Sequence, residues 1–232
     1  MIPIKDDNPT RRFAWLTLLL IAANTGVFAL EVLRAGGLLS PVSAEPVRAL
    51  VETFGMVPAR LFASNSPLPG WLSPPALLTF VTSSFLHADL LHLLGNMLYL
   101  WIFGNNIEDV MGRGRFLVFY LVCGSVAALS QALTQPASLV PMIGASGAVA
   151  GVLGAYLVRF PRAKVLVLVF FFFFVRLVRI PALIMLGLWF LFQVAYAGQG
   201  AAGIAWYAHI GGFVAGALLL HLFAEPRHRR RR

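Results

Sequence analysis

Long apolar runs separated by short polar segments dominate the pattern of this chain of 232 residues. A helix needs about 20 apolar residues to cross the hydrocarbon core of a bilayer. Six runs approach that length, the fourth being short, and they cover residues 13–33, 90–107, 116–133, 146–160, 181–197 and 204–223. The pattern predicts an all-α membrane protein with six transmembrane helices in residues 13–223, between a polar segment (1–12) and a basic tail (224–232).

The segment between the first two runs, residues 34–87, does not fit a long helix. It contains seven prolines, and proline removes a helical hydrogen bond and clashes with the preceding turn. It also carries apolar residues such as Trp71, Leu77 and Phe80. We therefore expect a structured loop that lies partly in the membrane interface.

A second irregular segment, Val165–Val175, contains five consecutive phenylalanines and lies between Lys164 and Arg176. As a helix with a rise of about 1.5 Å per residue, it would cross roughly half of the hydrocarbon core. We expect an interfacial or re-entrant segment on the cytoplasmic side that leads into the fifth span. A seventh span is the alternative, but it would place the C-terminal arginines outside, against the preference of Lys and Arg for cytoplasmic loops.

Composition agrees with a lipid environment. Hydrophobic residues make up 59% of the chain and charged residues 12%, and the mean hydropathy is +0.81. A soluble protein of this composition would expose large apolar patches. The single cysteine, Cys123, excludes an internal disulfide and a cysteine metal site, and we interpret it as a small lipid-facing or core residue. No metal site and no cofactor are predicted.

The net charge of +9 could suggest nucleic-acid binding, but the distribution of the basic residues argues against it. They lie in short clusters between apolar runs and in the tail Arg227–Arg232, and no soluble module remains to carry a nucleic-acid fold. Such clusters are typical of topology signals and of contacts to anionic lipids. With the N-terminus in the cytoplasm, only Arg34, Arg48 and Arg60 lie outside. We therefore expect the lipid bilayer, and no nucleic acid, as a partner.

Polar residues inside the spans are candidate functional residues, because lipid makes them costly. His92 and Asn96 are four residues apart and share one helix face. Both side chains can donate hydrogen bonds, which suits an oxyanion better than a transition metal, since an asparagine amide is a poor metal ligand. A polar contact between two helices is an equally good interpretation.

The fourth and sixth runs each begin with a residue of potential chemical use. Ser146 lies between Ala145 and Gly147 at a predicted helix start, where backbone N–H groups are unpaired. In isolation this pattern fits a helix cap or a packing face better than a nucleophile. His209, near the start of the last run, is the usual type of base for a serine. Asp89 is interpreted as a helix cap, so a serine–histidine dyad without a carboxylate is predicted.

Glycine spacing predicts that these two helices touch. Gly147 and Gly151 form one small-xxx-small pair, and Gly212 and Gly216 form another. Such pairs allow helix backbones to approach closely. If the two faces meet, the serine and the histidine come together at adjacent helix starts.

Four motifs follow one another along the chain. They are His87-x4-His92-x3-Asn96, Asn106–Arg115, Gly144–Gly147 and Ala208–Gly212. Together they resemble the rhomboid intramembrane serine proteases. The resemblance covers nearly the whole chain from Arg11 to Phe223.

The resemblance implies a compact, rhomboid-like six-helix bundle with a cytoplasmic N-terminus. Ser146 would be the nucleophile and His209 the general base. His92 and Asn96, with the Ser146 backbone N–H, would form the oxyanion hole, and His87 would have a structural or water-holding role nearby. Substrates would be membrane proteins, often single-pass, that are cut in or near their span. Because the chain carries no appended domain, we expect a bacterial plasma membrane.

Two positions depart from the family pattern. Arg60 and Trp71 are far apart where many members carry a Trp-Arg pair, and Ala150 stands where some carry a tyrosine that packs on the histidine. The group that holds His209 is therefore not identified by the sequence. Two other functions stay open: an inactive rhomboid-like protein that binds membrane clients, and a transporter or channel, which would carry intramembrane carboxylates or paired broken helices.

Overall fold

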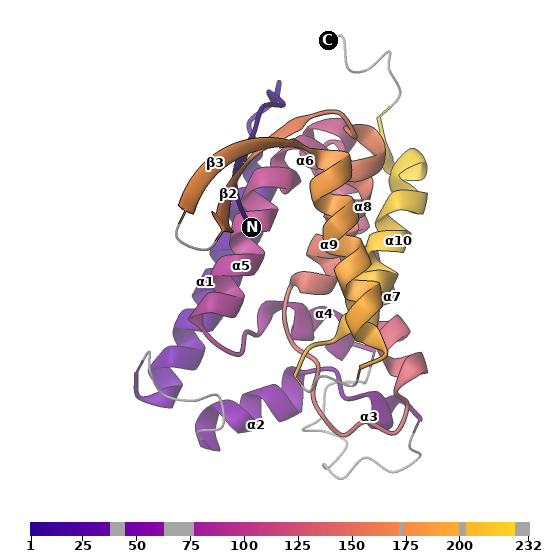
Figure 1. The fold of residues 1–232 in the computed structure, drawn as a ribbon. Coiled ribbons are helices and arrows are strands. Elements are labelled where there is room, and N and C mark those ends of the chain that lie inside the picture. The colour runs from indigo at the N-terminus through magenta and orange to yellow at the C-terminus, as the bar shows by residue number, and fades with distance from the viewer. Residues whose placement is uncertain (38–44, 63–76, 172–173, 200–202, 226–232) are drawn as a thin grey trace.

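The structure is a computed structural model that describes residues 1–37, 45–62, 77–171, 174–199 and 203–225 (Figure 1). The middle of the expected interfacial loop, including Trp71, lies outside the described residues. So does most of the expected basic tail.

Helices make up most of the described chain. In chain order they are α1 (Trp15–Ala35), α2 (Glu45–Phe54), α3 (Pro58–Phe62), α4 (Thr79–Thr82), the 3-10 helix η1 (Ser83–Phe85), α5 (Leu90–Tyr99), the π-helix η2 (Leu100–Gly104), α6 (Asn105–Met111), α7 (Arg113–Thr134), α8 (Ser146–Arg159), α9 (Ala182–Ala197) and α10 (Trp206–Phe223).

Three of these helices, α1, α7 and α10, are long and apolar enough to cross a membrane. The segments α5, η2 and α6 follow without a break, and with α4 and η1 they form a fourth candidate crossing that is bent by 102°. Helices α8 and α9 are apolar but shorter. The chain is therefore a multi-pass helical membrane protein with a helix at each of the six predicted positions, and the count of six crossings stays a prediction.

Helix α8 lies at the centre of the bundle. Every residue from Gly147 to Tyr156 is buried, as expected of a helix that is apolar on all sides and surrounded by others. Helices α7 and α10 pack against it. A buried helix of this kind holds its first residue, Ser146, at a defined place inside the protein.

The expectation of an all-α fold is wrong for the phenylalanine-rich segment and for the N-terminus. Lys164–Phe171 (β2) and Phe174–Pro181 (β3) form an antiparallel hairpin, and Ile2–Asp6 (β1) pairs antiparallel with β2. The three strands form one sheet in the order β1-β2-β3. Figure 1 shows this sheet curving along one side of the bundle, beside α5 and α6.

Local composition explains the hairpin. Valine and phenylalanine favour strands because their side chains fit a pleated surface. Val165 and Val167 are fully buried, whereas the intervening Leu166 is only partly buried, so one face of β2 packs on the helices. A continuous apolar run does not distinguish a strand from a buried helix, which is why the strand period was missed.

The N-terminal segment, expected to be merely polar, is anchored to the helices. The Asp6 carboxylate accepts hydrogen bonds from the Tyr156 hydroxyl on α8 and from Asn106 Nδ2, the latter at 2.9 Å. Asp7 accepts from the Lys164 backbone N–H at 2.8 Å. Burial raises the pKa of the Asp6 carboxyl, although its hydrogen bond from Tyr156 acts in the opposite direction.

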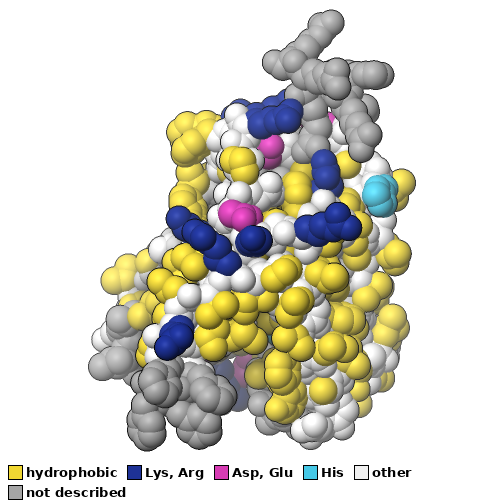
Figure 2. All heavy atoms as spheres, turned by 45° about the horizontal axis from the view of Figure 1, so that its top comes forward, with side chains coloured by type: hydrophobic (Ala, Val, Ile, Leu, Met, Phe, Trp, Pro, Cys, Tyr) yellow, Lys and Arg dark blue, Asp and Glu magenta, His cyan; other side chains and the backbone are white. Residues whose placement is uncertain are grey.

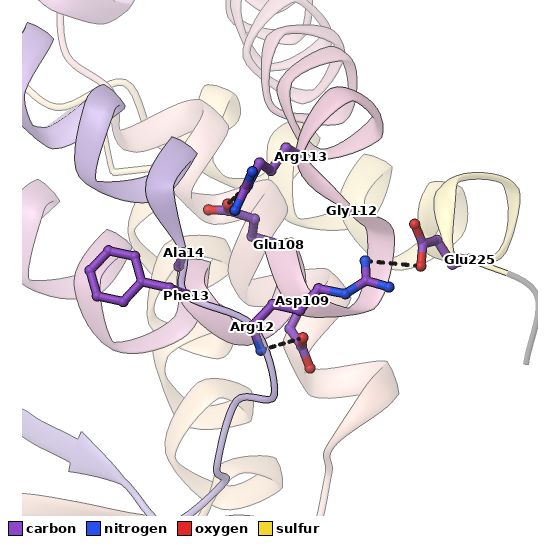
Figure 3. A pocket seen from close by; sticks show the side chains of 8 residues that line it. All are labelled: Arg12, Phe13, Ala14, Glu108, Asp109, Gly112, Arg113 and Glu225. Atoms are coloured by element: carbon purple, nitrogen blue, oxygen red, sulfur yellow. Dashed lines mark hydrogen bonds and ion pairs between the residues drawn. The ribbon is translucent and has the colours of Figure 1, made fainter. Parts of the chain in front are cut away.

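Glu108 on α6 lies beside the start of α1 (Figure 3). Its carboxylate accepts from the Leu16 N–H at 3.1 Å, the Thr17 N–H at 2.7 Å and the Thr17 hydroxyl at 2.8 Å. Nearby, Arg12 Nη1 pairs with Glu225 at 3.2 Å, which joins the segment before α1 to the segment after α10. A carboxylate at a helix N-terminus accepts hydrogen bonds from N–H groups that have no helical partner, and its negative charge interacts favourably with the positive end of the helix dipole.

Replacing Glu108 by alanine is expected to lower the free energy of unfolding by about 1–3 kcal/mol, because buried donors of α1 lose their acceptor. Thermal unfolding in detergent measures the effect. Asp109→Ala is the matched control, because Asp109 accepts one hydrogen bond, from the Arg12 N–H at 3.2 Å, at an exposed position. Equal destabilisation by the two variants would contradict the capping role of Glu108.

Candidate active site

Ser146 and His209 meet inside the bundle. Ser146 is the first residue of α8, and His209 lies in the first turn of α10. The Ser146 Oγ lies 2.8 Å from His209 Nε2, within hydrogen-bonding distance. Both residues are partly buried. As the first residue of its helix, Ser146 also presents a backbone N–H that has no helical carbonyl to pair with.

Glycines bring the two helices to this distance. A Cβ atom on Gly212 would lie 2.1 Å from the Gly147 carbonyl oxygen, and one on Gly216 would lie 1.8 Å from that of Gly151. The backbones of α8 and α10 therefore touch at two successive turns. The four glycines that were expected to mediate packing all lie in this contact.

His92 is held by its own helix start. The Asp89 side chain accepts from the His92 backbone N–H at 2.8 Å, so the prediction that Asp89 caps the helix is confirmed. The Ala88 N–H donates to His92 Nδ1 at 3.3 Å. A neutral imidazole carries one N–H, and because Nδ1 accepts here, the proton is on Nε2. His92 therefore presents a donor at Nε2.

Asn96 and Gly144 complete this side of the site. Asn96 is buried at 7% exposure, and its Nδ2 has no hydrogen-bond partner within the described chain. Gly144 has a φ of +116°, and a Cβ on it would lie 2.6 Å from His92 Nε2 and 3.7 Å from Asn96 Nδ2. Glycine is required at this position both for the backbone conformation and for the space. The two side-chain donors thus converge on the backbone just before Ser146.

His87 is placed behind His92 rather than in the cavity. It is fully buried, and its ring lies 5.1 Å from that of His92, edge to face. Its Nδ1 lies 3.3 Å from the Phe85 carbonyl oxygen, and its backbone N–H donates to Glu31 Oε2 at 3.3 Å. These contacts support a packing role for His87 next to His92.

One cavity of about 430 Å³ joins the candidate residues. It is lined by His92, Asn96, Ser146 and His209, together with Trp189 from α9. The four residues predicted to act as nucleophile, base and hydrogen-bond donors therefore face the same space. Among the described residues there is no cluster of three or more His, Cys, Asp or Glu that would hold a metal ion.

Three residues of this region were missed by the sequence analysis. The Gln193 Oε1 lies 2.8 Å from His209 Nδ1 and can accept a hydrogen bond from it. The Trp189 ring lies 5.9 Å from the same imidazole between centroids, and Glu31 is a carboxylate 3% exposed within the first apolar run. Gln193 and Glu31 were detectable, because each is a polar residue inside an apolar run, where lipid makes it costly. Ala150, where some family members carry a tyrosine, is fully buried.

The helices and this cavity define a multi-pass membrane protein with a serine–histidine pair. The family model of the Rhomboid domain matches residues 74–226, which is more than half of the chain. The chain therefore belongs to the rhomboid family, whose members are generally serine proteases that act within the bilayer.

Similar proteins come from mitochondria and from bacteria. The chain is 34% identical over 151 residues to Rhomboid protein 1, mitochondrial, of Saccharomyces cerevisiae, covering 61% of this chain and 40% of that protein. It is 32% identical over 111 residues to the human Presenilin-associated rhomboid-like protein, mitochondrial, covering 47% and 28%. It is 40% identical over 77 residues to Rhomboid protease GluP of Bacillus subtilis, covering 33% and 15%. The chain thus matches less than half of the length of each relative.

Proposed function

We propose that this protein is an intramembrane serine endopeptidase that uses Ser146 and His209 as a dyad. The observation that carries the proposal is the 2.8 Å contact between Ser146 Oγ and His209 Nε2 at a cavity that also contains His92 and Asn96. A serine hydroxyl is a weak nucleophile until an adjacent base removes its proton. Rhomboid membership supports protease activity within the bilayer.

In the proposed mechanism, His209 Nε2 takes the hydroxyl proton as Ser146 Oγ bonds to the scissile carbonyl carbon. The resulting oxyanion accepts hydrogen bonds from His92 Nε2–H, Asn96 Nδ2–H and the Ser146 backbone N–H. The imidazolium then gives its proton to the leaving amine, and an acyl-enzyme forms. A water molecule, deprotonated by His209, attacks the ester carbonyl, and the imidazolium then gives this proton to Ser146 Oγ as the ester bond breaks and the acid product leaves.

The proposed substrates are membrane proteins, mainly single-pass, that are cut in or near their span. A helix in lipid satisfies all its backbone groups internally, so the substrate must unwind locally before its carbonyl can reach the serine. The apolar lining of the cavity, including Val149, Leu153 and Trp189, suits such a segment.

We propose six crossings within residues 13–223, with residues 1–12 and 224–232 in the cytoplasm. Figure 2 shows Lys and Arg side chains gathered at the end of the bundle that carries α6 and the sheet, above a largely hydrophobic flank. Cytoplasmic ends of membrane proteins are rich in Lys and Arg. Ser146 starts α8, and α8 ends at this basic end with Arg159, so Ser146 lies toward the opposite, non-cytoplasmic side of the bundle in this proposal.

The origins of the similar proteins suggest two candidate membranes for this protein. The mitochondrial proteins named above favour a mitochondrial inner membrane over the bacterial plasma membrane expected from the sequence, whereas the Bacillus protein agrees with the latter. In both compartments the protein is an integral, multi-pass membrane protein.

The test uses the purified full chain in detergent with a single-span substrate and a fluorophosphonate probe. We expect cleavage of the substrate and a covalent probe adduct that mass spectrometry maps to Ser146. Ser146→Ala is expected to lose both signals. Continued cleavage by Ser146→Ala would overturn the assignment, and a wild-type protein that neither cleaves nor reacts would favour the client-binding function.

Replacing Asn96 by alanine is expected to lower kcat by about 10²- to 10³-fold with little change in KM, because its amide donates a hydrogen bond to the oxyanion that develops in the transition state. Single-turnover cleavage in detergent measures the effect. Gln199→Ala, at an exposed amide near the end of α9, is the control. An Asn96→Ala variant that raised only KM would place the side chain in substrate binding instead.

A further inference from the structure

Gln193 is a buried amide whose two ends have different partners. It lies on α9 and is 6% exposed. Its Nε2 donates to the Trp189 carbonyl oxygen, one turn earlier, at 3.2 Å. Its Oε1 lies 2.8 Å from His209 Nδ1 on α10. Within the described chain, this side chain is therefore the group that meets the nitrogen of His209 opposite the serine.

The Trp189 carbonyl determines which end of the amide faces the histidine. A carbonyl oxygen only accepts hydrogen bonds, so it selects the NH₂ end of Gln193 and turns Oε1 toward His209. Oε1 also only accepts, so His209 Nδ1 must carry a proton to bond it. A neutral imidazole has one N–H, and Nε2 is thereby left as the acceptor that faces the Ser146 hydroxyl.

We propose that Gln193 is a positioning residue that holds His209 in the tautomer able to take the proton of Ser146. The proposal rests on the proposed dyad and identifies the group that supports its base. In many serine hydrolases a third group orients the histidine that activates the serine and fixes its tautomer. Here the third group is a neutral amide in place of a carboxylate.

Helix α9 also fixes the plane of the ring. The Trp189 ring lies 5.9 Å from the His209 ring, tilted by 37°, and Trp206 meets the imidazole edge to face at 6.4 Å. Trp189 and Gln193 are one turn apart, so a single face of α9 supplies both the aromatic contact and the hydrogen bond. A displacement of α9 from α10 would break both contacts and leave the base free to rotate.

The test compares Gln193→Met, which keeps length without an acceptor, with Gln193→Glu, which keeps an acceptor oxygen. Gln199→Met is the matched control, since Gln199 makes the same kind of backbone bond, to Ala195, and is exposed. All variants are full-length protein in detergent. The readouts are kcat and KM for a single-span substrate, thermal unfolding, and ¹⁵N NMR of histidine-labelled protein, with His209→Ala used to assign the His209 signals.

Wild type and Gln193→Glu are expected to show His209 protonated at Nδ1, and Gln193→Met a mixture of both tautomers. Gln193→Met is expected to lower kcat by about ten- to a hundredfold at unchanged KM and unfolding temperature, because the base is misplaced in part of the molecules. Gln193→Glu is expected to restore most of kcat.

A Gln193→Met variant with wild-type kcat and an unchanged tautomer would overturn the proposal. So would equal losses in Gln193→Met and Gln193→Glu, which would indicate packing alone. If no variant, wild type included, cleaves a substrate, the proposed protease function fails. The NMR tautomer still tests the role of Gln193 in that case, because it does not depend on turnover.

Discussion

Replacing His209 by alanine is expected to lower the turnover of a single-span substrate by about 10⁶-fold, which leaves only the residual rate supplied by the oxyanion donors and substrate binding, since removal of the histidine from a serine protease has an effect of this order. Without the imidazole, the Ser146 hydroxyl loses the base that lies 2.8 Å away at His209 Nε2, and the described part of the chain offers no second base at hydrogen-bonding distance. Binding of the substrate span is expected to persist, because the apolar wall of the cavity is unchanged.

The double variant Ser146→Ala/His209→Ala gives the sharper test. If the two residues act as one unit, the double variant is no slower than either single variant. Initial rates at high enzyme concentration measure this, with His221→Ala, an exposed histidine on the same helix, as the control. Losses that multiply in the double variant would show that serine and histidine contribute independently, against a dyad.

Replacing Gly216 by alanine is expected to prevent the described packing of α8 on α10 and to abolish activity with it. The new Cβ would lie 1.8 Å from the Gly151 carbonyl oxygen and 2.6 Å from its Cα. Both obstacles are backbone atoms, so no side-chain rotation relieves the clash and the helices must separate. Effects above about 4 kcal/mol are exceptional for single substitutions and arise from core overpacking of this kind.

Monodisperse yield, thermal unfolding and probe labelling of Ser146 measure this effect together. The control is Gly187→Ala on α9, where an added Cβ meets no atom within 4 Å. Alanine there is expected to be neutral or to stabilise by up to about 1 kcal/mol, because it favours the helix. A folded, active Gly216→Ala protein would mean that α8 and α10 are not in backbone contact.

The positions of the helices could be predicted from the sequence because lipid imposes a simple rule. A crossing segment must satisfy its backbone groups internally, so apolar length alone indicates a helix. The predicted runs 116–133 and 146–160 correspond to α7 and α8 within a few residues. The same rule failed for Val165–Val175. There, backbone groups are satisfied by pairing between strands, and β2 pairs with β1, which lies about 160 residues earlier in the chain.

The candidate site was predictable in part. Ser146, His92, Asn96 and His209 are residues whose chemical types and order along the chain indicate a nucleophile, two donors and a base. Their roles stay predictions, although the structure brings them to one cavity. Gln193 is recognisable in the sequence as a polar residue in an apolar run, but its partner was not predictable, because one glutamine carries no sign of a histidine 16 residues away on the next helix.

By itself, the sequence determined that the chain is a multi-pass helical membrane protein of the rhomboid family, because apolar length and ordered motifs are local properties. Only the tertiary structure decided that Gln193 faces His209 Nδ1, that His92 presents its Nε2–H, and that the N-terminus joins a sheet. Each of these depends on hydrogen bonds whose direction is set by the position of a second group, and that position exists only once the helices have packed.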